Sequence, residues 1–316
     1  MKDKGKQMEN INNFDALIKR AIALPMQKIA VVCGDDPNAI EAIERSVKNN
    51  IANAVMVGDE KATKKLADKL GVDQTLFEYV DEPDRTIAAK KAVDLIKAGE
   101  AQIIMKGSVG TDIYARAILD KENGLMPKNA VMTHITALES EHYSKLLFLS
   151  DVAILPEPTI KQKILMINYC VEAAQHFGID LPKVAVLSFV EKVNPKIQST
   201  VDAAVLSKMS QRHQIKNCIV DGPLAMDIAI SPECLHGKKV DSPVQAQADI
   251  LILPNLETGN ILYKGLIHLG KAKVAGILAG PSCPGVLVSR TDSEDVKFYS
   301  IAFAVYLSAK RLEKNK

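Results

Sequence analysis

Polar side chains follow several short apolar runs of this sequence, at the places where buried strands are expected to end. The segments are CGDD at 33–36, KGS at 106–108, EKVNPK at 191–196, DGP at 221–223, PN at 254–255 and SRTD at 289–292. In open α/β sheets, ligands bind beyond the carboxyl ends of the strands. These segments are therefore the places where the sequence can do chemistry.

The segment KGSVGTD at 106–112 runs from an expected strand into an expected helix. The first amide groups of a helix are free to bind an anion. The small residues Gly107, Ser108 and Gly110 let a ligand approach the backbone. The segment does not match GxxxxGK[ST], and no GxGxxG follows an expected strand. A phosphate-binding turn and an ordinary tight turn with a glycine therefore stay open as alternatives.

The segment SRTDSED at 289–295 is the second candidate for phosphate chemistry. The guanidinium of Arg290 has the fork geometry that suits phosphate oxygens. Ser289 contributes a hydroxyl, and either Asp292 or Asp295 can act as a base. The alternative is that Arg290 only pairs with its acidic neighbours at the start of a helix.

The segment GNILYKGL at 259–266 places Tyr263 beside Lys264 in an expected helix. Asn260 and Lys264 are four residues apart and share a helix face. The alternative is that Lys264 is an ordinary solvated lysine. The six histidines are scattered without HxxxH or HExxH spacing, so we expect no metal site. No GxSxG motif supports a covalent hydrolase.

Short apolar runs alternate with amphipathic stretches along the whole chain. Expected strands are 28–33, 54–58, 101–107, 184–189, 217–222, 249–254, 273–280 and 285–289, and expected helices include 37–49, 84–98 and 292–311. In the helix at 84–98, Ile87 and Ala88 are expected on the buried face together with Val93 and Ile96. This alternation predicts parallel sheets with helices on both faces.

Two β-like runs, 129–140 and 145–155, interrupt this alternation and form an expected hairpin. We place the crossover into a second domain near residue 132. By fold analogy, the last helix returns to the first domain. The predicted domains are therefore 1–132 plus 292–316, and 133–291.

Composition excludes several classes of protein. The 316 residues include 40 Lys and Arg against 38 Asp and Glu, with no basic block and no Trp, so nucleic-acid binding is not expected. No run approaches the roughly 20 apolar residues of a membrane span, and no export signal is visible, so no membrane partner is expected. The five cysteines are widely spaced without CxxC, which favours reduced thiols and a cytoplasmic location.

Five longer segments occur in a recognisable order: MKGSVGTDIYARAILDKENGL at 105–125, VAVLSFVEKVNPKIQSTVDAA at 184–204, IVDGPLAMDIAIS at 219–231, ADILILPNLETGNILYKGL at 248–266 and LVSRTDSEDVKFYSIAFA at 287–304. Together they resemble the phosphate acetyl/butyryltransferase family, and more closely its phosphate butyryltransferase branch. The resemblance covers most of 100–304 and is looser over 28–100.

The resemblance implies two three-layer α/β domains with mostly parallel sheets and an interdomain cleft, a fold like that of isocitrate and isopropylmalate dehydrogenases. It implies an acyltransferase that moves a short-chain acyl group reversibly between coenzyme A (CoA) and inorganic phosphate. Butyryl or a branched C4–C5 group is favoured by the branch. CoA enters as a substrate and no cofactor is implied. Members are commonly homodimers or larger, so we expect a homo-oligomer.

Residue by residue, the resemblance assigns an anion-binding set. The SR pair of the family falls on Ser289 and Arg290, and its arginine grips the phosphate. Tyr263 and Lys264 line the same phosphate pocket. The remaining expected binding residues are Lys106, Ser108 and Thr111 at the small-residue loop, Arg116 on the helix that follows it, and Asn260.

The catalytic base is where this sequence departs from the acetyltransferase branch. That branch places its aspartate six residues after the arginine, and here this position is Val296. The butyryl-type branch has an aspartate at the position of Asp292. We therefore favour Asp292 as the base, with Asp295 as the second candidate. Ser289 and Arg290 are the other expected catalytic residues.

Other readings compete with this one. The most similar alternative activity is that of an acetyl-specific phosphotransacetylase. An enzyme that uses acyl carrier protein would need a basic docking face, and the near-neutral charge of this chain gives no sign of one. A 4-hydroxythreonine-phosphate dehydrogenase is favoured only by DGPLAMD at 221–227, and it needs histidine metal ligands that the scattered histidines do not supply. A non-catalytic binding module is disfavoured by the retained Ser289, Arg290, Tyr263 and Lys264. The sequence leaves acyl length, oligomer number and physiological direction open.

Overall fold

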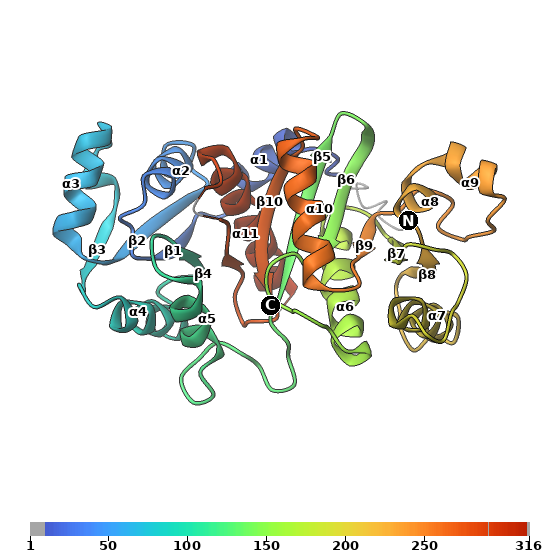
Figure 1. Cartoon of the computed structure of the whole chain (residues 1–316). Helices are drawn as coiled ribbons and strands as arrows, with labels where there is room; N and C mark the ends of the chain where they lie inside the picture. The colour runs from blue at the N-terminus through green and yellow to red at the C-terminus, as the bar shows by residue number, and fades with distance from the viewer. Residues whose placement is uncertain (1–9, 290, 315–316) are drawn as a thin grey trace, which may run out of the picture. The chain divides into compact units, whose positions relative to one another are not determined.

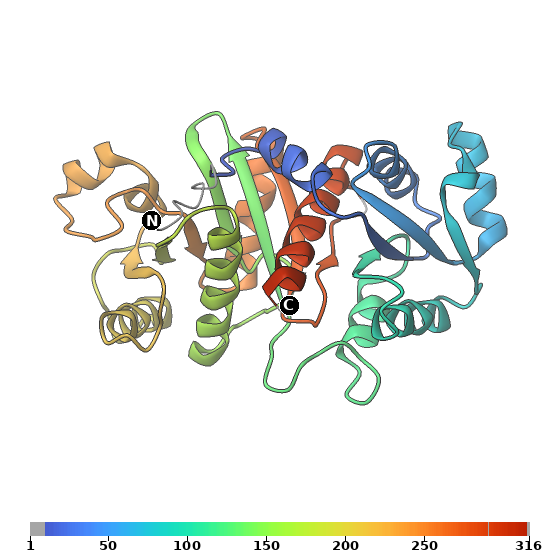
Figure 2. The ribbon, with the colours of Figure 1, turned by 180° about the vertical axis from the view of Figure 1, so that it is seen from behind.

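The computed structural model describes residues 10–289 and 291–314. Helices alternate with mostly parallel strands along the chain (Figures 1 and 2), which confirms the predicted α/β class. The described residues divide into two compact units. Unit 1 contains 10–16, 138–152 and 156–272, and unit 2 contains 17–137, 153–155, 273–289 and 291–314.

The two units differ from the predicted domains at the residue where the chain returns to the first domain. The return occurs at residue 273 rather than 292, because β11 (Gly285–Val286) pairs in parallel with β4 (Ile103–Lys106). β10 (Lys273–Ala279) pairs with β11 in the antiparallel direction and therefore belongs to the same unit. The forward crossover lies inside β5 (Thr133–Ser140), a few residues after the predicted position.

Unit 2 contains the strand order β3-β2-β1-β4-β11-β10. Its remaining elements are α1 (Phe14–Ile22, which starts in unit 1), β1 (Gln27–Val32), α2 (Pro37–Lys48), β2 (Ala52–Gly58), α3 (Glu60–Leu70), η1 (Gln74–Leu76), β3 (Glu78–Asp81), α4 (Arg85–Lys97), α5 (Thr111–Leu119) and α11 (Glu294–Lys314). β1 runs parallel to both β2 and β4, and β2 runs parallel to β3. The carboxyl ends of these strands therefore meet at one edge.

Alternation along β1 divides the core of unit 2 into two layers. Ala30 and Val32 belong to the apolar cluster that α4 and α5 complete, whereas Ile29 and Val31 point to the other face. α2 packs with α11 away from the α4 and α5 layer (Figures 1 and 2). The expected buried face of α4 is wrong at one position: Ile87 is exposed, because small alanines carry the close contact with the sheet.

Side-chain caps set where the helices of unit 2 begin. Asp36 accepts a hydrogen bond from the backbone N–H of Ala39, and Pro37 occupies the first turn of α2. Asp84 caps α4 in the same way, with its carboxylate bonded to the amides of Thr86 and Ile87. These caps place the start of each helix directly after a strand or its loop, and so fix which side chains reach the carboxyl edge of the sheet.

Unit 1 contains the parallel strand order β6-β9-β7-β8. Its elements are β6 (Tyr143–Ser150), α6 (Ile160–His176), β7 (Lys183–Leu187), α7 (Gln198–Gln211), β8 (Ile219–Leu224), α8 (Met226–Ile230), α9 (Pro232–Lys238), β9 (Ile250–Ile252) and α10 (Leu256–His268). α6 and α10 cover opposite faces of β6 and β9 (Figures 1 and 2). β5 and β6 form the predicted hairpin.

All five cysteines lie among the described residues and are free thiols. Within 10–289 and 291–314, no helix is long and apolar enough to cross a membrane.

Candidate active site

Three parallel strands of unit 2 end at one sheet edge, and most of the predicted residues follow them. The register pairs Val286 of β11 with Met105 of β4, so the loops after these two strands leave the sheet together. Gly107 packs so closely on the loop after β1 that an added Cβ would lie 2.1 Å from the carbonyl oxygen of Cys33. The backbone N–H of Ser108 then donates to that same carbonyl at 2.8 Å. The glycine of the KGS segment is therefore required by this close approach.

Ser108 stands at the centre of a group of hydrogen-bonded side chains at this edge. Its hydroxyl donates to Asp35 Oδ1 at 2.5 Å and accepts from the guanidinium of Arg85 at 3.0 Å. Arg85 also pairs with Asp35 Oδ2 at 3.0 Å. The three side chains close a ring of charge-assisted hydrogen bonds. Ser108 was predicted to bind phosphate, and here its hydroxyl is shared between Asp35 and Arg85.

The sequence pattern places Asp35 after a strand but predicts no role for it, and no motif distinguishes Arg85. Arg85 follows the N-cap Asp84 and resembles any first-turn residue of a helix. No spacing rule connects it with Ser108, because the link is made by α4 packing against β1 and β4. Only a three-dimensional arrangement reveals that this arginine belongs to the edge.

Lys106 and Cys33 line the interior of the same edge. Lys106 ends β4, is buried, and its ammonium donates to the carbonyl of Gly107 at 3.2 Å. Burial raises the pKa of the Cys33 thiol to about 11, while Arg85 and Lys106 oppose this shift and Asp35 adds to it. The thiolate is the nucleophilic form of cysteine. Cys33 is therefore protonated at neutral pH, and its side chain packs at this edge instead of acting as a nucleophile.

The residues after β11 form a turn that Asp292 holds. Asp292 Oδ2 accepts a hydrogen bond from the backbone N–H of Ser289 at 2.8 Å, and the hydroxyls of Ser289 and Thr291 lie 3.0 Å apart. Ser289 is exposed and Asp292 is half-buried. Arg290 lies outside the described residues. The structure thus brings Ser289 and Asp292 to the sheet edge that also carries Lys106 and Ser108.

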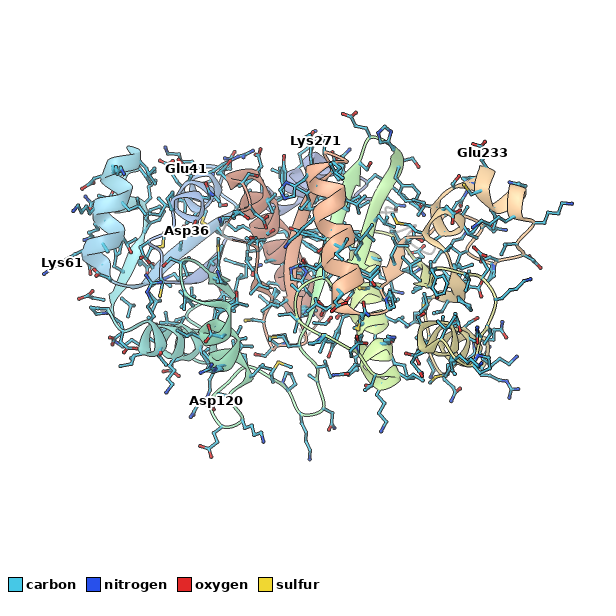
Figure 3. The ribbon with its side chains drawn as sticks, in the orientation of Figure 1. Asp36, Glu41, Lys61, Asp120, Glu233 and Lys271 are labelled. Carbon is cyan, nitrogen blue, oxygen red and sulfur yellow. The ribbon has the colours of Figure 1, made fainter. Side chains whose placement is uncertain are left out.

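The backbone of this turn is anchored to the start of α2. The carbonyl oxygen of Asp292 accepts from Asn38 Nδ2 at 3.1 Å and from Lys297 Nζ at 3.3 Å. Lys297 is buried and also pairs with Asp36 Oδ1 at 3.3 Å. Figure 3 labels Asp36 at the start of α2. The turn is therefore tied down from two sides, as a site that must hold its geometry requires.

Asp295, the second candidate base, has a different environment. It lies in the first turn of α11 and pairs with Arg45 at 2.7 Å, with 59% of its side chain exposed. Glu294 pairs with the same guanidinium at 3.1 Å, and Arg45 stacks over the ring of Phe298 at 3.9 Å. The carboxylate of Asp295 thus serves an ion-pair cluster between α11 and α2.

Thr111 and Arg116 lie on α5, which begins after the small-residue loop. Thr111 is exposed, and the N-cap Gly110 supplies no side-chain hydrogen bond to the first turn. Arg116 is 80% exposed and pairs with Asp112 at 3.3 Å. It lines a groove of about 410 Å³ that also includes Asp120, which Figure 3 labels. None of its described contacts reaches the ring around Ser108.

Asn260, Tyr263 and Lys264 lie on α10 in unit 1. The amide of Asn260 donates to the carbonyl of Val152 at 3.1 Å, and Lys264 is exposed on the same helix face. Gly259 allows this contact, because a Cβ there would lie 2.1 Å from the carbonyl oxygen of Asp151. The other candidate residues belong to unit 2. A pocket shared by the two sets stays a prediction.

The carboxyl edge of unit 1 contains a cavity of about 1000 Å³, lined in part by Pro254 and Asn255 but by no residue with a predicted role. Its floor carries a buried ion pair between Lys163 and Asp202, with Nζ 2.7 Å from Oδ2. The sequence signal was the segment 184–204, which supported the family resemblance but received no role. Among residues 10–289 and 291–314, no group of three His, Cys, Asp or Glu side chains gathers where it can hold a metal ion.

Comparisons with known proteins point to one family. A sequence model described as "Phosphate acetyl/butaryl transferase" matches residues 84–305. The chain is 45% identical over 301 residues to a phosphate butyryltransferase of Clostridium acetobutylicum, covering 95% of this chain and 100% of that protein. It is 41% identical over 278 residues to a phosphate acetyltransferase of Thermotoga maritima, covering 88% and 94%.

A solved structure is similar over the same length. It is the crystal structure of a branched-chain phosphotransacylase from Enterococcus faecalis V583, with 30% identity and a TM-score of 0.79. The likeness covers 90% of this chain and 99% of that chain. The family match spans more than half of the sequence and the relatives span nearly all of it. This chain therefore belongs to the phosphate acetyl/butyryltransferase family, as its ordered motifs predict.

Proposed function

We propose that this protein transfers a short-chain acyl group reversibly between CoA and inorganic phosphate, giving acyl phosphate and free CoA in one direction. The observation that carries this proposal is the family match over 84–305, which includes every predicted site residue. The arrangement of unit 2 supports it, because Lys106, Ser289 and Asp292 share one carboxyl edge.

The proposed chemistry is a direct transfer within one ternary complex. In the direction of acyl-CoA synthesis, the thiol of CoA loses its proton to the Asp292 carboxylate. The thiolate attacks the acyl carbonyl of acyl phosphate, a carbon–sulfur bond forms, and the bond to the phosphate oxygen breaks. The reverse direction returns the proton to the thiol. No residue of the protein becomes acylated, and no cofactor takes part in the proposed steps.

Cationic side chains stabilise the leaving phosphate in this proposal. Arg290 is the main phosphate ligand, and Lys264, Tyr263 and Asn260 of α10 are further phosphate ligands in this proposal. Ser289 supports the oxyanion. Each preorganised contact of this kind is worth about 3–4 kcal/mol in the transition state.

Secondary contacts come from the loop before α5. Thr111 and Ser108 contribute donors at this loop, and Lys106 contributes a buried positive charge. Arg116 binds a more distant anionic part of the substrate, which agrees with its exposed position on α5.

The proposed acyl group is butyryl or a branched C4–C5 group. This choice is supported by the names of two relatives, a butyryltransferase and a branched-chain phosphotransacylase. The acetyltransferase of T. maritima supports an acetyl-specific enzyme as the alternative. One methylene group changes discrimination by only about 1–3 kcal/mol, so the answer needs a rate comparison.

The experiment measures CoA release from butyryl-CoA, isobutyryl-CoA and acetyl-CoA with a thiol reagent, with and without inorganic phosphate. We expect release that depends on phosphate, with acyl phosphate recovered as a hydroxamate after addition of hydroxylamine. The four- and five-carbon substrates are expected to react faster than acetyl-CoA. Release without phosphate would identify a thioesterase, and absence of release with every substrate would overturn the proposal.

Assembly and location complete the proposal. We propose a homodimer or larger homo-oligomer, as the family resemblance implies, and a cytoplasmic location, which the absence of a disulfide among the five cysteines supports. Light scattering coupled to size-exclusion chromatography tests the assembly directly. A mass near the 34.4 kDa of a single chain would contradict it.

A further inference from the structure

A buried histidine contacts the segment that leads into the Ser289–Asp292 turn. His134, near the start of β5, is 3% exposed, and the proposed chemistry gives it no role. Its Nε2 atom lies 2.9 Å from the carbonyl oxygen of Leu287. A carbonyl oxygen can only accept a hydrogen bond, so Nε2 carries a proton and donates it. His134 therefore holds a backbone atom two residues before Ser289.

The imidazole reaches Leu287 across an intervening strand. The strand order is β11-β10-β5, so β10 separates the two residues (Figure 1). The register pairs Ile277 of β10 with Val286 of β11, and its continuation places Gly276 opposite Leu287. A Cβ on Gly276 would lie 2.7 Å from Cε1 of His134 and 2.8 Å from its Nε2. The missing side chain of Gly276 thus makes room for the ring.

The second ring nitrogen of His134 is bonded as well. Oγ1 of Thr136 lies 3.3 Å from Nδ1, and the Thr136 side chain is fully buried. Residues 134 and 136 share one face of β5. In the neutral ring with its proton on Nε2, Nδ1 accepts from the Thr136 hydroxyl. Together the two hydrogen bonds select one tautomer and one orientation of the imidazole.

The strand that the imidazole crosses is tied to α11. The backbone N–H of Gly276 donates to Ser300 Oγ at 2.8 Å, and the Ser300 hydroxyl donates to the carbonyl of Val296 at 2.7 Å. Ser300 is fully buried. α11 also carries Lys297, whose ammonium donates to the carbonyl oxygen of Asp292. The surroundings of His134 are therefore connected to the element that holds the other end of the turn.

The turn is thus held at both ends by buried donors. At its entry, His134 bonds Leu287 one residue beyond the paired part of β11, and at its exit Asn38 and Lys297 bond Asp292. One extended residue spans only about 3.3 Å, so a displacement of Leu287 is passed on to Ser289. A misplacement of about 1 Å can cost an enzyme about 100-fold in rate.

We propose that His134 is a positioning residue for acyl transfer, an assignment that rests on the proposed function. The buried ring acts through the backbone: Nε2–H fixes the Leu287 carbonyl, and this fixes where Ser289 and Asp292 meet the phosphate and the thiol. A group that acts in this way affects the chemical step more than the binding of acyl-CoA. Loss of His134 should therefore lower kcat while the KM for butyryl-CoA changes little.

The test measures CoA release from butyryl-CoA at saturating inorganic phosphate in two variants of His134. His134→Leu has a similar volume and no donor, and we expect kcat to fall about tenfold or more, with the KM for butyryl-CoA within about threefold. His134→Gln restores a side-chain N–H at about the reach of Nε2, and kcat should return to within about threefold of the unmodified protein.

Gln27 provides the matched control. It is 5% exposed, and its Nε2 donates to the carbonyl of Val305 at 3.1 Å. It lies in the same unit but begins β1, at the opposite edge of the sheet. Gln27→Met removes this buried side-chain bond to a backbone carbonyl, and kcat should stay within about twofold, because the bond does not reach the turn.

Two further measurements separate a displaced turn from a general loss of stability. Amide hydrogen exchange of peptides covering 285–296 should be several-fold faster in His134→Leu than in Gln27→Met or the unmodified protein. Thr136→Val keeps the imidazole and removes the bond that orients it, so kcat should fall by about two- to tenfold. This variant decides the question if His134→Leu does not fold.

Two results would overturn the assignment. One is an unchanged kcat in both His134→Leu and Thr136→Val. The other is a loss of kcat in Gln27→Met as large as that in His134→Leu, because any buried bond of unit 2 would then have the same effect. Failure of the proposed function is distinguishable from both. If the unmodified protein releases no CoA while exchange over 285–296 rises in His134→Leu, the transferase proposal falls and the positioning of the turn by His134 stands.

Discussion

The two units place different chemistry at equivalent positions, the carboxyl ends of their parallel strands. In unit 2, Asp35, Ser108 and Arg85 form a ring whose arginine is 48% exposed. In unit 1, Lys163 and Asp202 form a pair with 4% and 7% of their side chains exposed, beneath an apolar wall. These two groups thus differ in burial: the Asp35–Arg85 pair of unit 2 is open to water, and the Lys163–Asp202 pair of unit 1 is buried.

The difference in burial also changes how much each ion pair contributes to the free energy of unfolding. A charge that remains in water is screened, so an exposed pair contributes about 0–1 kcal/mol. A buried pair has lost its hydration, and removing one partner strands the other charge in a low-dielectric site. Removing one partner of the buried pair is therefore expected to cost much more stability than removing one partner of an exposed pair.

The largest expected effect follows from breaking the buried pair. Lys163→Met leaves the Asp202 carboxylate buried without its cation, and we expect a loss of about 3–5 kcal/mol in the free energy of unfolding. Urea unfolding followed by circular dichroism measures it. The double variant Lys163→Met with Asp202→Leu should recover most of the loss, because no charge is then left unpaired.

An exposed lysine provides the matched control for that measurement. Lys48 pairs with Glu44 at 2.6 Å on α2, with 60% of the lysine side chain exposed. Lys48→Met should cost no more than about 0.5 kcal/mol. Equal losses for the two lysine variants would remove the distinction between a buried and an exposed edge.

The second prediction concerns the polar edge of unit 2. If Asp292 is the base, Asp292→Asn should lower kcat by about 100-fold or more. The remaining rate should rise about tenfold per pH unit up to about pH 8.5, because solvent then produces the CoA thiolate that the enzyme no longer forms. Stopped-flow or steady-state CoA release across this pH range measures both effects.

Asp295 provides the comparison that sharpens this assignment. Its carboxylate pairs with Arg45 at the surface, so Asp295→Asn should change kcat by less than about threefold. A loss in Asp292→Asn without the steeper pH dependence would mean that Asp292 only holds the Ser289 turn. A large loss in Asp295→Asn instead would transfer the role of base to that residue.

A smaller effect should be shared by both units. Burial raises the pKa of Cys33 in unit 2 and of Cys218 in unit 1 from the ordinary thiol value of 9.0 to about 11. The folded state then holds these protons at a pH where the unfolded chain has released them. The stabilisation is fully present below about pH 9 and is lost as the pH rises toward 11, by about 1 kcal/mol per thiol at pH 10.

Thermal unfolding between pH 8 and 10.5 measures this loss, and Cys33→Ala and Cys218→Ala should each make the stability less dependent on pH.

The same burial predicts which thiols react in the folded protein at neutral pH. Cys234 is the half-buried member of the five, so it should react first with a thiol reagent. Rapid reaction of Cys33 or Cys218 in the folded protein would show that their burial is not maintained in solution.

The alternation of short apolar runs and amphipathic stretches predicted every described strand except β3, because burial on a sheet leaves a local pattern. It gave no helix at α1, α6, α8 or α9. The same logic was wrong at Ile87, where close packing of α4 requires alanines rather than the largest apolar residue. Glycine at position 107 marked a close backbone approach that the structure shows against Cys33. Local features of this kind are encoded within a few residues of chain.

Partnerships between distant segments left no such pattern. Arg85 reaches Ser108 only because α4 packs beside β4, and Lys163 meets Asp202 only because α6 and α7 are neighbours. The ion pair of Asp295 with Arg45 likewise joins residues 250 positions apart. Such contacts depend on which elements the order of strands in the sheet brings together. No local pattern in a single sequence predicts that order.

The order and chemistry of its motifs were thus enough to identify the family of this protein, since those motifs are contiguous and each must satisfy its own backbone geometry. Which carboxylates are tied into ion pairs, which lysines are buried and where an apolar cavity opens were decided by tertiary packing. The physical reason is that desolvation and pairing are properties of a place in the fold, and residues reach that place from segments far apart in the chain.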